Sequence, residues 1–421
     1  MSTVGQNGMP RNIVPQGADW NFGHGSLRTH RGWQYAAYWD DGRQVCVARR
    51  KLPSAPWEVV SLPGYQRTQN INRGHGGSVS RGFGDGHEKV SMGISPDGVI
   101  HLMFDHHLST LHYRTSKAAV ASRPGETAWS ADLFGPVQDH LGAHTLESVT
   151  YPAFYTDGDH FLLYLRMGGG SGSANSHLFT YADGVWKVNE EAASKFIDRA
   201  WSGGDKTVNA YPHGLAFHDG RLHLTWCWRD TPDPRTCHDL CYTYSDDLGQ
   251  TWRNNAGKRV AQRGERFITA DSPGISVSPI PAGARYVNGG SMTVDRAGRV
   301  HVLVVGEDGR PAHFEREPES AEWRRREAKR LGAIVAGRDG LLLVVATDGL
   351  WQVLDRDFGA MRRVVPGRPA LFASSKMAID PARVAHDGRV SAIGQQGSTV
   401  SVVDYSVDSS VGPSLVPSPA K

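Results

Sequence analysis

Four residues of the sequence form a set that could move a proton and stabilise negative charge: His87, His107, Tyr151 and Arg166. Histidine and tyrosine side chains act as general acids and bases, and a fixed guanidinium stabilises charge that develops in a transition state. Arg166 lies in the apolar run FLLYLRM, where a buried guanidinium needs a partner, and an anionic ligand is one such partner. No pair of carboxylates stands out for ordinary glycoside hydrolysis. On sugars, this set fits β-elimination at a uronic acid, in which a base removes the C5 proton and an acid protonates the oxygen that leaves C4.

Members of this set also have structural explanations, which the sequence leaves open. His87 has no counterpart in the repeats described below, whereas histidines at a repeated strand position, such as His101, are interpreted as packing residues. His106 and His107 together end a predicted strand, so at least one of them must face solvent or a ligand. Tyr151 is as compatible with the core as with an acid–base role.

A second group of polar residues is interpreted as candidates for substrate binding. The group consists of His106, Asn209, Tyr211, Arg229 and His238. The glycine-rich stretch MGGGSGS at 167–173 is followed by neither a lysine nor a helical pattern, which argues against a phosphate-binding loop.

The elements that must position these residues appear as a repeat, in which an Asp-Gly-type turn joins two apolar runs. The copies are VSMGISPDGVIHLMF at 90–104, AFYTDGDHFLLYLR at 153–166, HGLAFHDGRLHLTW at 213–226, SMTVDRAGRVHVLVV at 291–305, AIVAGRDGLLLVVA at 333–346, RVAHDGRVSAIG at 383–394, and a looser GWQYAAYWDDGRQVCVAR at 32–49. A third strand usually follows, and a fourth often contains tryptophan. Seven such units predict an all-β fold, a seven-bladed β-propeller with four antiparallel strands per blade.

Propeller geometry predicts that the polar candidates share one surface. In each blade the Asp-Gly turn between the first two strands lies at one end. The start of the first strand, the end of the second and the start of the third then lie at the opposite end. The candidates fall repeatedly at this second end, so we expect His87, His107, Tyr151 and Arg166 to line one pocket there.

The segment SDDLGQTW at 245–252 matches the Asp-box pattern S-x-D-x-G-x-T-W. In this pattern the Asp and Thr side chains stabilise a hairpin turn and the Trp packs between sheets. The motif therefore supports the propeller but carries no chemistry.

Length and charge bound the remaining possibilities. We expect residues 1–421 to form a single propeller domain, with blades from about 18 to 408 and a disordered Pro/Ser-rich tail at 409–421. A net charge of +3 from 46 basic and 43 acidic residues indicates neither a nucleic-acid nor a membrane partner. We expect a monomer. The polar N-terminus has no signal-peptide pattern, so the sequence is compatible with a mature secreted form, our expectation, and with a cytoplasmic protein.

The four cysteines leave three interpretations open. Cys227 and Cys241 fall roughly opposite each other in a predicted hairpin and could form a disulfide, or they could be buried thiols. Cys237, His238 and Cys241 could bind zinc, although their spacing is not a usual zinc pattern. We expect no organic cofactor, while a structural calcium or zinc ion remains compatible with the sequence.

Three segments resemble the BNR-repeat propeller polysaccharide lyases, a group that includes ulvan lyases and L-rhamnose-α-1,4-D-glucuronate lyases. They are HEKVSMGISPDGVIHLMFDHHLSTLHYRTS, SVTYPAFYTDGDHFLLYLRMGGGSGS, and NAYPHGLAFHDGRLHLTWCWRD with HDLCYTYSDDLGQTWRNN, and MTVDRAGRVHVL extends the match. The resemblance implies a catalytic set of two histidines, a tyrosine and an arginine, which fall on His87, His107, Tyr151 and Arg166. The sequence departs from the group at His87-Glu88, where His-Asn is usual.

The resemblance implies a lyase that cleaves a rhamnosyl-(1→4)-glucuronate linkage in an acidic glycan and leaves an unsaturated uronate. Arg166 would neutralise the carboxylate, His107 and Tyr151 would form the acid–base pair, and His87 would assist or bind. Two alternatives stay open: a glycoside hydrolase on the same propeller, such as a rhamnosidase or a sialidase, and a non-catalytic glycan-binding propeller.

Overall fold

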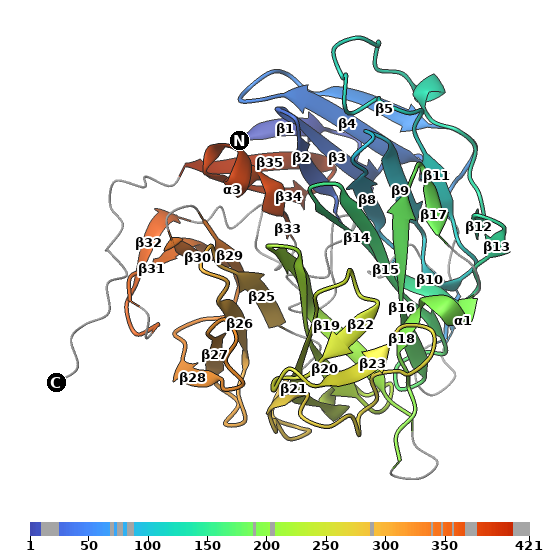
Figure 1. Ribbon diagram of the computed structural model, residues 1–421. Helices are drawn as coiled ribbons and strands as arrows, with labels where there is room; N and C mark the ends of the chain where they lie inside the picture. Colours follow the sequence, from blue (N-terminus) through green and yellow to red (C-terminus); the bar gives the residue numbers. More distant parts are fainter. Residues whose placement is uncertain are drawn as a thin grey trace.

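Seven antiparallel sheets are arranged in a ring, which makes the chain a seven-bladed β-propeller (Figure 1). This computed structural model describes residues 1–9, 25–67, 71–73, 79–81, 88–187, 191–202, 207–286, 290–337, 340–346, 348–355, 358–366 and 377–406. The predicted fold class is confirmed. His87 and the expected disordered tail at 409–421 lie outside the described residues.

The blades follow one another along the chain. The first blade contains β2 (Leu27–His30), β3 (Trp33–Trp39), β4 (Val45–Lys51) and β5 (Glu58–Leu62). The second contains β8 (Val90–Ile94), β9 (Ile100–Phe104) and β11 (Tyr113–Thr115). The third contains β14 (Val149–Asp157), β15 (His160–Gly168), β16 (Ala174–Ala182) and β17 (Val185–Lys187). The fourth contains β19 (Asn209–His218), β20 (Arg221–Arg229), β21 (Cys237–Ser245), β22 (Thr251–Arg253) and β23 (Arg259–Gln262). The fifth contains β25 (Gly290–Val294), β26 (Val300–Val305), β27 (Pro311–Arg316) and β28 (Arg324–Glu327). The sixth contains β29 (Ala333–Ala336), β30 (Leu342–Ala346), β31 (Gly349–Val353) and β32 (Met361–Pro366). The seventh contains β33 (Met377–Asp380), β34 (Arg389–Gln396), β35 (Thr399–Ser406) and β1 (Ser2–Gly5).

Short elements decorate the blades. β10 (His107–Ser109) pairs with β14, β18 (Lys195–Ile197) with β16, and β24 (Ser276–Ser278) with β21. Two hairpins consist of β6 (Ile71–Arg73) with β7 (Val79–Arg81) and β12 (His140–Leu141) with β13 (His144–Thr145). The helices within the described residues are α1 (Glu191–Ser194), α3 (Pro381–Asp387) and the 3-10 turns η1 (Ala131–Leu133) and η2 (Pro234–Thr236). None of the described helices has the length and apolar character needed to cross a membrane.

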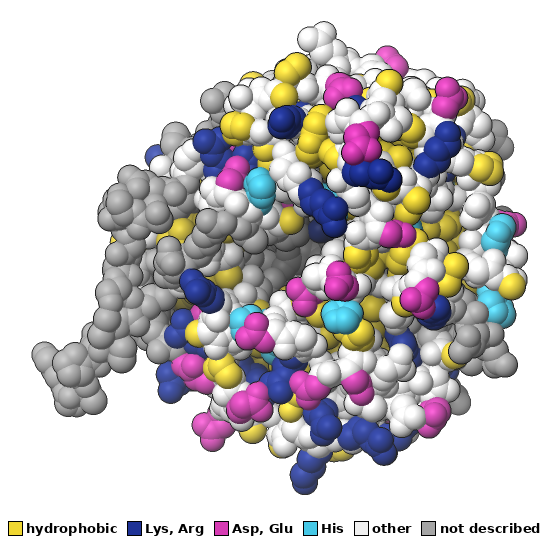
Figure 2. All heavy atoms as spheres, turned by 45° about the horizontal axis from the view of Figure 1, so that its top comes forward, with side chains coloured by type: hydrophobic (Ala, Val, Ile, Leu, Met, Phe, Trp, Pro, Cys, Tyr) yellow, Lys and Arg dark blue, Asp and Glu magenta, His cyan; other side chains and the backbone are white. Residues whose placement is uncertain are grey.

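Strands in the middle of the blades are buried on both faces where a blade packs against two neighbours, as in β9 and β30. All five residues of β9 are buried, which explains why IHLMF reads as a nearly continuous apolar run. The Asp-box also behaves as predicted: the Asp247 carboxylate accepts hydrogen bonds from the Ser245 and Thr251 hydroxyls at 2.8 and 2.7 Å, and Trp252 is fully buried. On the face shown in Figure 2, basic and acidic side chains are interspersed.

Two repeats differ from their expected form. In the first blade the Asp41-Gly42 turn joins the second and third strands, β3 and β4, because β2 adds an inner strand ahead of the recognised copy. In the last blade, residues 381–387 form helix α3 instead of a strand. Asp380 caps this helix by accepting from Ala382 N–H at 3.1 Å, and Gly388 ends it at a φ of 74°, so local capping chemistry overrides the repeat.

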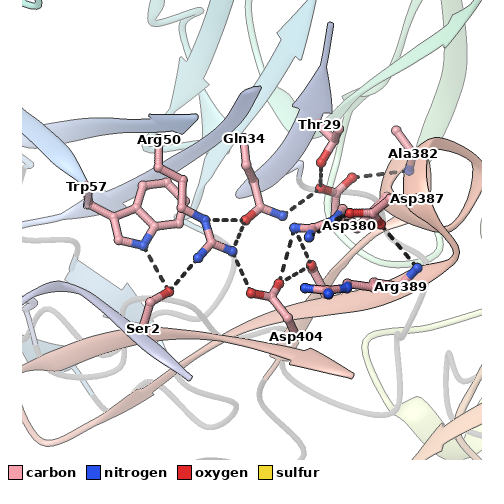
Figure 3. A network of polar contacts seen from close by, with 12 residues as sticks. Ser2, Thr29, Gln34, Arg50, Trp57, Asp380, Ala382, Asp387, Arg389 and Asp404 are labelled. Atoms are coloured by element: carbon pink, nitrogen blue, oxygen red, sulfur yellow. Dashed lines mark hydrogen bonds and ion pairs between the residues drawn. The ribbon is translucent and has the colours of Figure 1, made fainter. Parts of the chain in front are cut away.

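The ring is closed by pairing between the two termini, which covers strand edges that an open ring would expose. Ser2 pairs with Val402, so the N-terminal strand β1 becomes the outer strand of the seventh blade, earlier than the expected start near residue 18. A polar network joins this blade to the first (Figure 3). Arg50 donates to Asp404 and to Ser2, each at 2.8 Å. Gln34 donates to Asp380 at 3.0 Å.

Replacing Asp404 by alanine is expected to destabilise the propeller by about 3 kcal/mol, the typical effect of removing one partner from a buried ion pair. Asp404 accepts from Arg50 at 2.8 Å and from Arg383 at 3.3 Å, and the two arginine side chains are only 2% and 0% exposed. Chemical denaturation measures the change. As a control, Glu126→Ala removes a solvent-exposed ion pair with Arg123 and should cost less than about 1 kcal/mol. Equal effects of the two substitutions would show that the network does not secure the closure.

Candidate active site

The strand register places the candidate residues at the end of the blades away from the Asp-Gly turns. In the third blade Thr150 pairs with Arg166, while Asp157 pairs with His160 next to the turn. In the fourth blade Asn209 pairs with Arg229 at the same far end. The predicted common end therefore holds for the third and fourth blades.

Arg166 is a buried guanidinium whose neighbours are aromatic. It is 3% exposed, and its guanidinium carbon lies 4.9 Å from the ring centroid of Tyr151 and 5.1 Å from that of Tyr211. Its Nε and Nη1 atoms are buried and have no hydrogen-bond partner. Since an arginine in a protein stays protonated, Arg166 is a buried charge for which the described segments supply no carboxylate partner.

The same environment recurs at Arg316, at the opposite end of the propeller. Arg316 is 2% exposed, its Nε and Nη1 also lack partners, and it lies 5.1 Å and 5.6 Å from the rings of Tyr242 and Tyr244. It ends β27 and pairs with Val300, the residue that follows the turn at Gly298. A buried guanidinium between two tyrosines is therefore not sufficient to define a functional site. What distinguishes Arg166 from Arg316 must lie in the other residues around Arg166.

Tyr151 has a strained backbone. Its φ is +56°, and the register of β14 against β15 shifts between Thr150 and Ala153. A left-handed conformation costs a non-glycine residue on the order of 1–3 kcal/mol and is typically retained where function requires it. The strain accompanies a tyrosine ring that is 6% exposed and stacked against Arg166.

Tyr211 connects Arg166 to the glycine-rich stretch that follows it. The Tyr211 hydroxyl lies 2.6 Å from Ser171 Oγ. Asn209 holds the same loop, because its Oδ1 accepts from Ala174 N–H at 2.5 Å and its Nδ2 donates to the Gly170 carbonyl at 3.3 Å. Asn209, expected to bind substrate, thus uses both ends of its amide to anchor this loop.

The loop packs directly against the fourth blade. Gly172 has a φ of +85°, and a Cβ atom there would lie 2.2 Å from the backbone carbonyl oxygen of Asp230. Only glycine fits such an approach. The sequence analysis did not identify Ser171 or Asp230 as part of the site. The pattern that could have indicated them is the run of small residues directly after Arg166, which ends a strand.

His107 lies in the same row as Arg166. It begins β10, which crosses from the second blade to pair with β14, and its partner there is Thr150, itself the partner of Arg166. Residues directly opposite in antiparallel strands project to the same face. Two strand spacings, about 10 Å, separate the Cα atoms of His107 and Arg166, and the imidazole and the guanidinium can approach each other more closely than this because both side chains are long.

Of the histidine pair, the structure exposes only His107. His106 is 1% exposed, and its Nε2 accepts from the backbone N–H of His112 at 2.9 Å. Burial holds the pKa of His106 well below its ordinary value, so this ring is neutral. Its hydrogen bond from the His112 backbone stabilises the turn. His87 cannot be placed, while the next residue, Glu88, is described and buried.

Arg229 and His238 lie further along the fourth blade. Arg229 stacks on the ring of Tyr211, with its guanidinium carbon 5.4 Å from the ring centroid, and it donates to the Thr231 carbonyl at 3.0 Å. Next to it, Pro232, Asp233, Pro234 and Arg235 line a cavity of about 390 Å³. The cavity lies beside Arg229, which donates to the Pro232 carbonyl, and its lining includes none of His107, Tyr151 and Arg166.

The ring nitrogens of His238 lie 2.9 Å from Asp230 and from Asp239. Burial alone would lower the pKa of His238, but the two carboxylates raise it above its ordinary value. Both ring nitrogens of His238 thus contact carboxylates, and no group of three metal-ligating side chains occurs in the described ranges. All four cysteines are described and buried, and none forms a disulfide. In the strand register Cys241 pairs with Trp226 rather than with Cys227.

Comparisons with known proteins agree with this architecture. A family model described as BNR repeat-containing family member matches residues 33–331. The polysaccharide lyase Uly1 is similar in structure, with a TM-score of 0.69 and 17% identity over 94% of this chain and 91% of that one. The PL25 ulvan lyase bound to -[GlcA(1-4)Rha3S]- has a TM-score of 0.63 and 13% identity over 96% and 94%.

A lectin shares the fold to a lesser degree. The BP39L lectin from Burkholderia pseudomallei has a TM-score of 0.50 and 13% identity, over 91% of this chain and 93% of the lectin. A search of curated proteins found no significant sequence match. At such identities the structural likeness establishes the shared fold.

Proposed function

This chain belongs to the BNR repeat-containing family, and from this premise we propose that it is a polysaccharide lyase that cleaves a rhamnosyl-(1→4)-glucuronate linkage by β-elimination. The observation that carries the proposal is Arg166, a buried charge beside two tyrosines that no carboxylate of the described residues neutralises. A uronate carboxylate is the anion that would complete this site. The lyases among the structural neighbours support the reaction class.

In the proposed reaction the Arg166 guanidinium binds the uronate carboxylate and stabilises the charge that grows on it as the C5 proton leaves. His107 and Tyr151 form the acid–base pair. One removes the C5 proton, the electron pair forms the C4–C5 double bond, and the C4–O bond breaks. The other protonates the departing oxygen, so the products are an unsaturated uronate and a free hydroxyl on the leaving group.

Arg166 serves this reaction better than a mobile surface charge would. Its stacking between Tyr151 and Tyr211 fixes the guanidinium before substrate arrives, and a preorganised charge needs no reorganisation during the reaction. Tyr211 is itself fixed by Ser171, so the glycine-rich loop supports the arginine indirectly. We propose a binding role for Arg229, which stacks on the same ring.

Incubation with a glycan that carries rhamnose on O4 of glucuronate tests the proposal. The expected result is a rise in ultraviolet absorbance, because the new double bond is conjugated with the carboxylate. The matched control is the same glycan with its carboxyl groups reduced to alcohols, which should give no absorbance and bind more weakly. Release of sugar without absorbance would identify a hydrolase, and binding without either product would identify a lectin; each outcome contradicts the lyase.

A further inference from the structure

A buried ion triad lies between the first two blades, next in sequence to the turn that carries His107. Arg67 donates through Nη2 and Nε to Glu88 Oε2 at 2.7 and 3.1 Å. The Arg67 Nε also lies 3.9 Å from Asp105 Oδ1. All three side chains are at most 1% exposed.

Such a triad is a poor device for stability alone. Desolvation cancels much of the attraction in a buried ion pair, and apolar side chains of similar volume often serve a core as well or better. A planar guanidinium does supply geometry, because its rigid fork holds carboxylates at defined positions. The second blade thus contains a rigid polar anchor at the end of β9.

Asp105 connects this anchor to His107. Its Oδ2 accepts from the Tyr65 hydroxyl at 2.5 Å, and its backbone carbonyl accepts from Ser109 Oγ at 2.9 Å, which closes the turn. The φ of Asp105 is +62°, a conformation that persists in a non-glycine residue only where the surroundings over-determine it. The triad and Tyr65 provide these surroundings.

The far side of the same turn is attached to the third blade. The backbone N–H of Leu108 donates to Thr150 Oγ1 at 3.1 Å, and Leu108 also has a left-handed φ of +58°. His107 is therefore bracketed by two left-handed residues, one held by the second blade and the other by the third. Its position depends on both attachments.

We propose that Arg67 is a positioning residue for His107. Through its two hydrogen bonds to Glu88 and its charge 3.9 Å from Asp105 Oδ1, it fixes the end of β9. It thereby fixes the direction in which the turn presents the His107 imidazole to the row that contains Arg166. The kinetic consequence rests on the proposed lyase function, whereas the structural consequence does not.

Arg67→Lys keeps the charge but loses the fork, and Arg67→Met loses both. We expect turnover of the glucuronate glycan to fall roughly 10- to 100-fold in Arg67→Lys with KM nearly unchanged, since a small misplacement of a reacting group has this effect. Arg67→Met should fall further or fail to fold, so the conclusion rests on the lysine variant. The imidazole NMR signals of His107, assigned with His107→Ala, should shift or broaden in Arg67→Lys.

Arg383→Lys is the matched control. Arg383 is 0% exposed and also bridges two carboxylates, Asp387 at 2.9 Å and Asp404 at 3.3 Å, but it lies in α3 of the seventh blade. This variant should lose stability while turnover and the His107 signals remain unchanged. Unaltered His107 signals in Arg67→Lys, or equal changes in both variants, would overturn the proposal. If the wild-type protein lacks lyase activity but the signals respond only at Arg67, the proposed function fails and the positioning role stands.

Discussion

Turnover of a glucuronate glycan should fall about 100- to 1000-fold when Arg166 is replaced by alanine, as is typical when one preorganised donor is lost. Removal of the C5 proton builds negative charge on the neighbouring carboxylate, so the guanidinium stabilises the transition state more than the ground state. Arg166→Lys keeps the charge but loses the planar fork and its stacking on Tyr151 and Tyr211, and should restore only part of the rate. Steady-state ultraviolet assays on folded protein measure both effects.

Arg316→Ala provides an unusually close control for this experiment. Arg316 matches Arg166 in burial, in its two tyrosine neighbours and in its unpaired Nε and Nη1 atoms, but it lies at the opposite end of the propeller. Both alanine variants should therefore lose similar stability, as measured by thermal melting, while only Arg166→Ala loses turnover. Near-normal turnover in Arg166→Ala, or an equal loss in both, would mean that Arg166 has a structural role only.

The second large effect is expected at His107. His107→Ala should reduce turnover about 100- to 10,000-fold, the usual contribution of a positioned proton-transfer group. His107 is the partly exposed member of its pair and shares a row with Arg166 through Thr150. The same ultraviolet assay measures this loss, and binding of the glycan should be affected much less than turnover.

His101→Ala is the control for His107. His101 is 1% exposed, and its ring nitrogens lie 2.6 Å from the Tyr113 hydroxyl and 3.0 Å from Ser95 Oγ. Burial lowers the pKa of His101 to about 3, so the ring is neutral and structural. Its loss should lower the melting temperature and leave the turnover of folded protein nearly intact. A His107→Ala enzyme that is as active as His101→Ala would remove His107 from the mechanism.

Much of the architecture could be predicted from the sequence because it depends on local chemistry. Asp-Gly turns between apolar runs define hairpins within a few residues, and their repetition predicts the blades and the end at which Arg166 and Arg229 lie. The packing role of His101 follows equally from its repeated strand position. Helix α3 shows the limit of this reasoning, because Asp380 and Gly388 supply caps that the repeat pattern does not reveal.

What the sequence by itself determined is therefore the seven-bladed ring and the end at which the polar residues of the third and fourth blades lie. Tertiary structure decided which of these residues are available to a ligand. His106 and His107 are adjacent in sequence, yet one is buried against His112 and the other begins a strand on the next blade. Arg166 and Arg67 are both buried arginines, but only Arg67 is paired with carboxylates. These differences arise from contacts between blades, which join residues far apart in the chain and leave no local pattern.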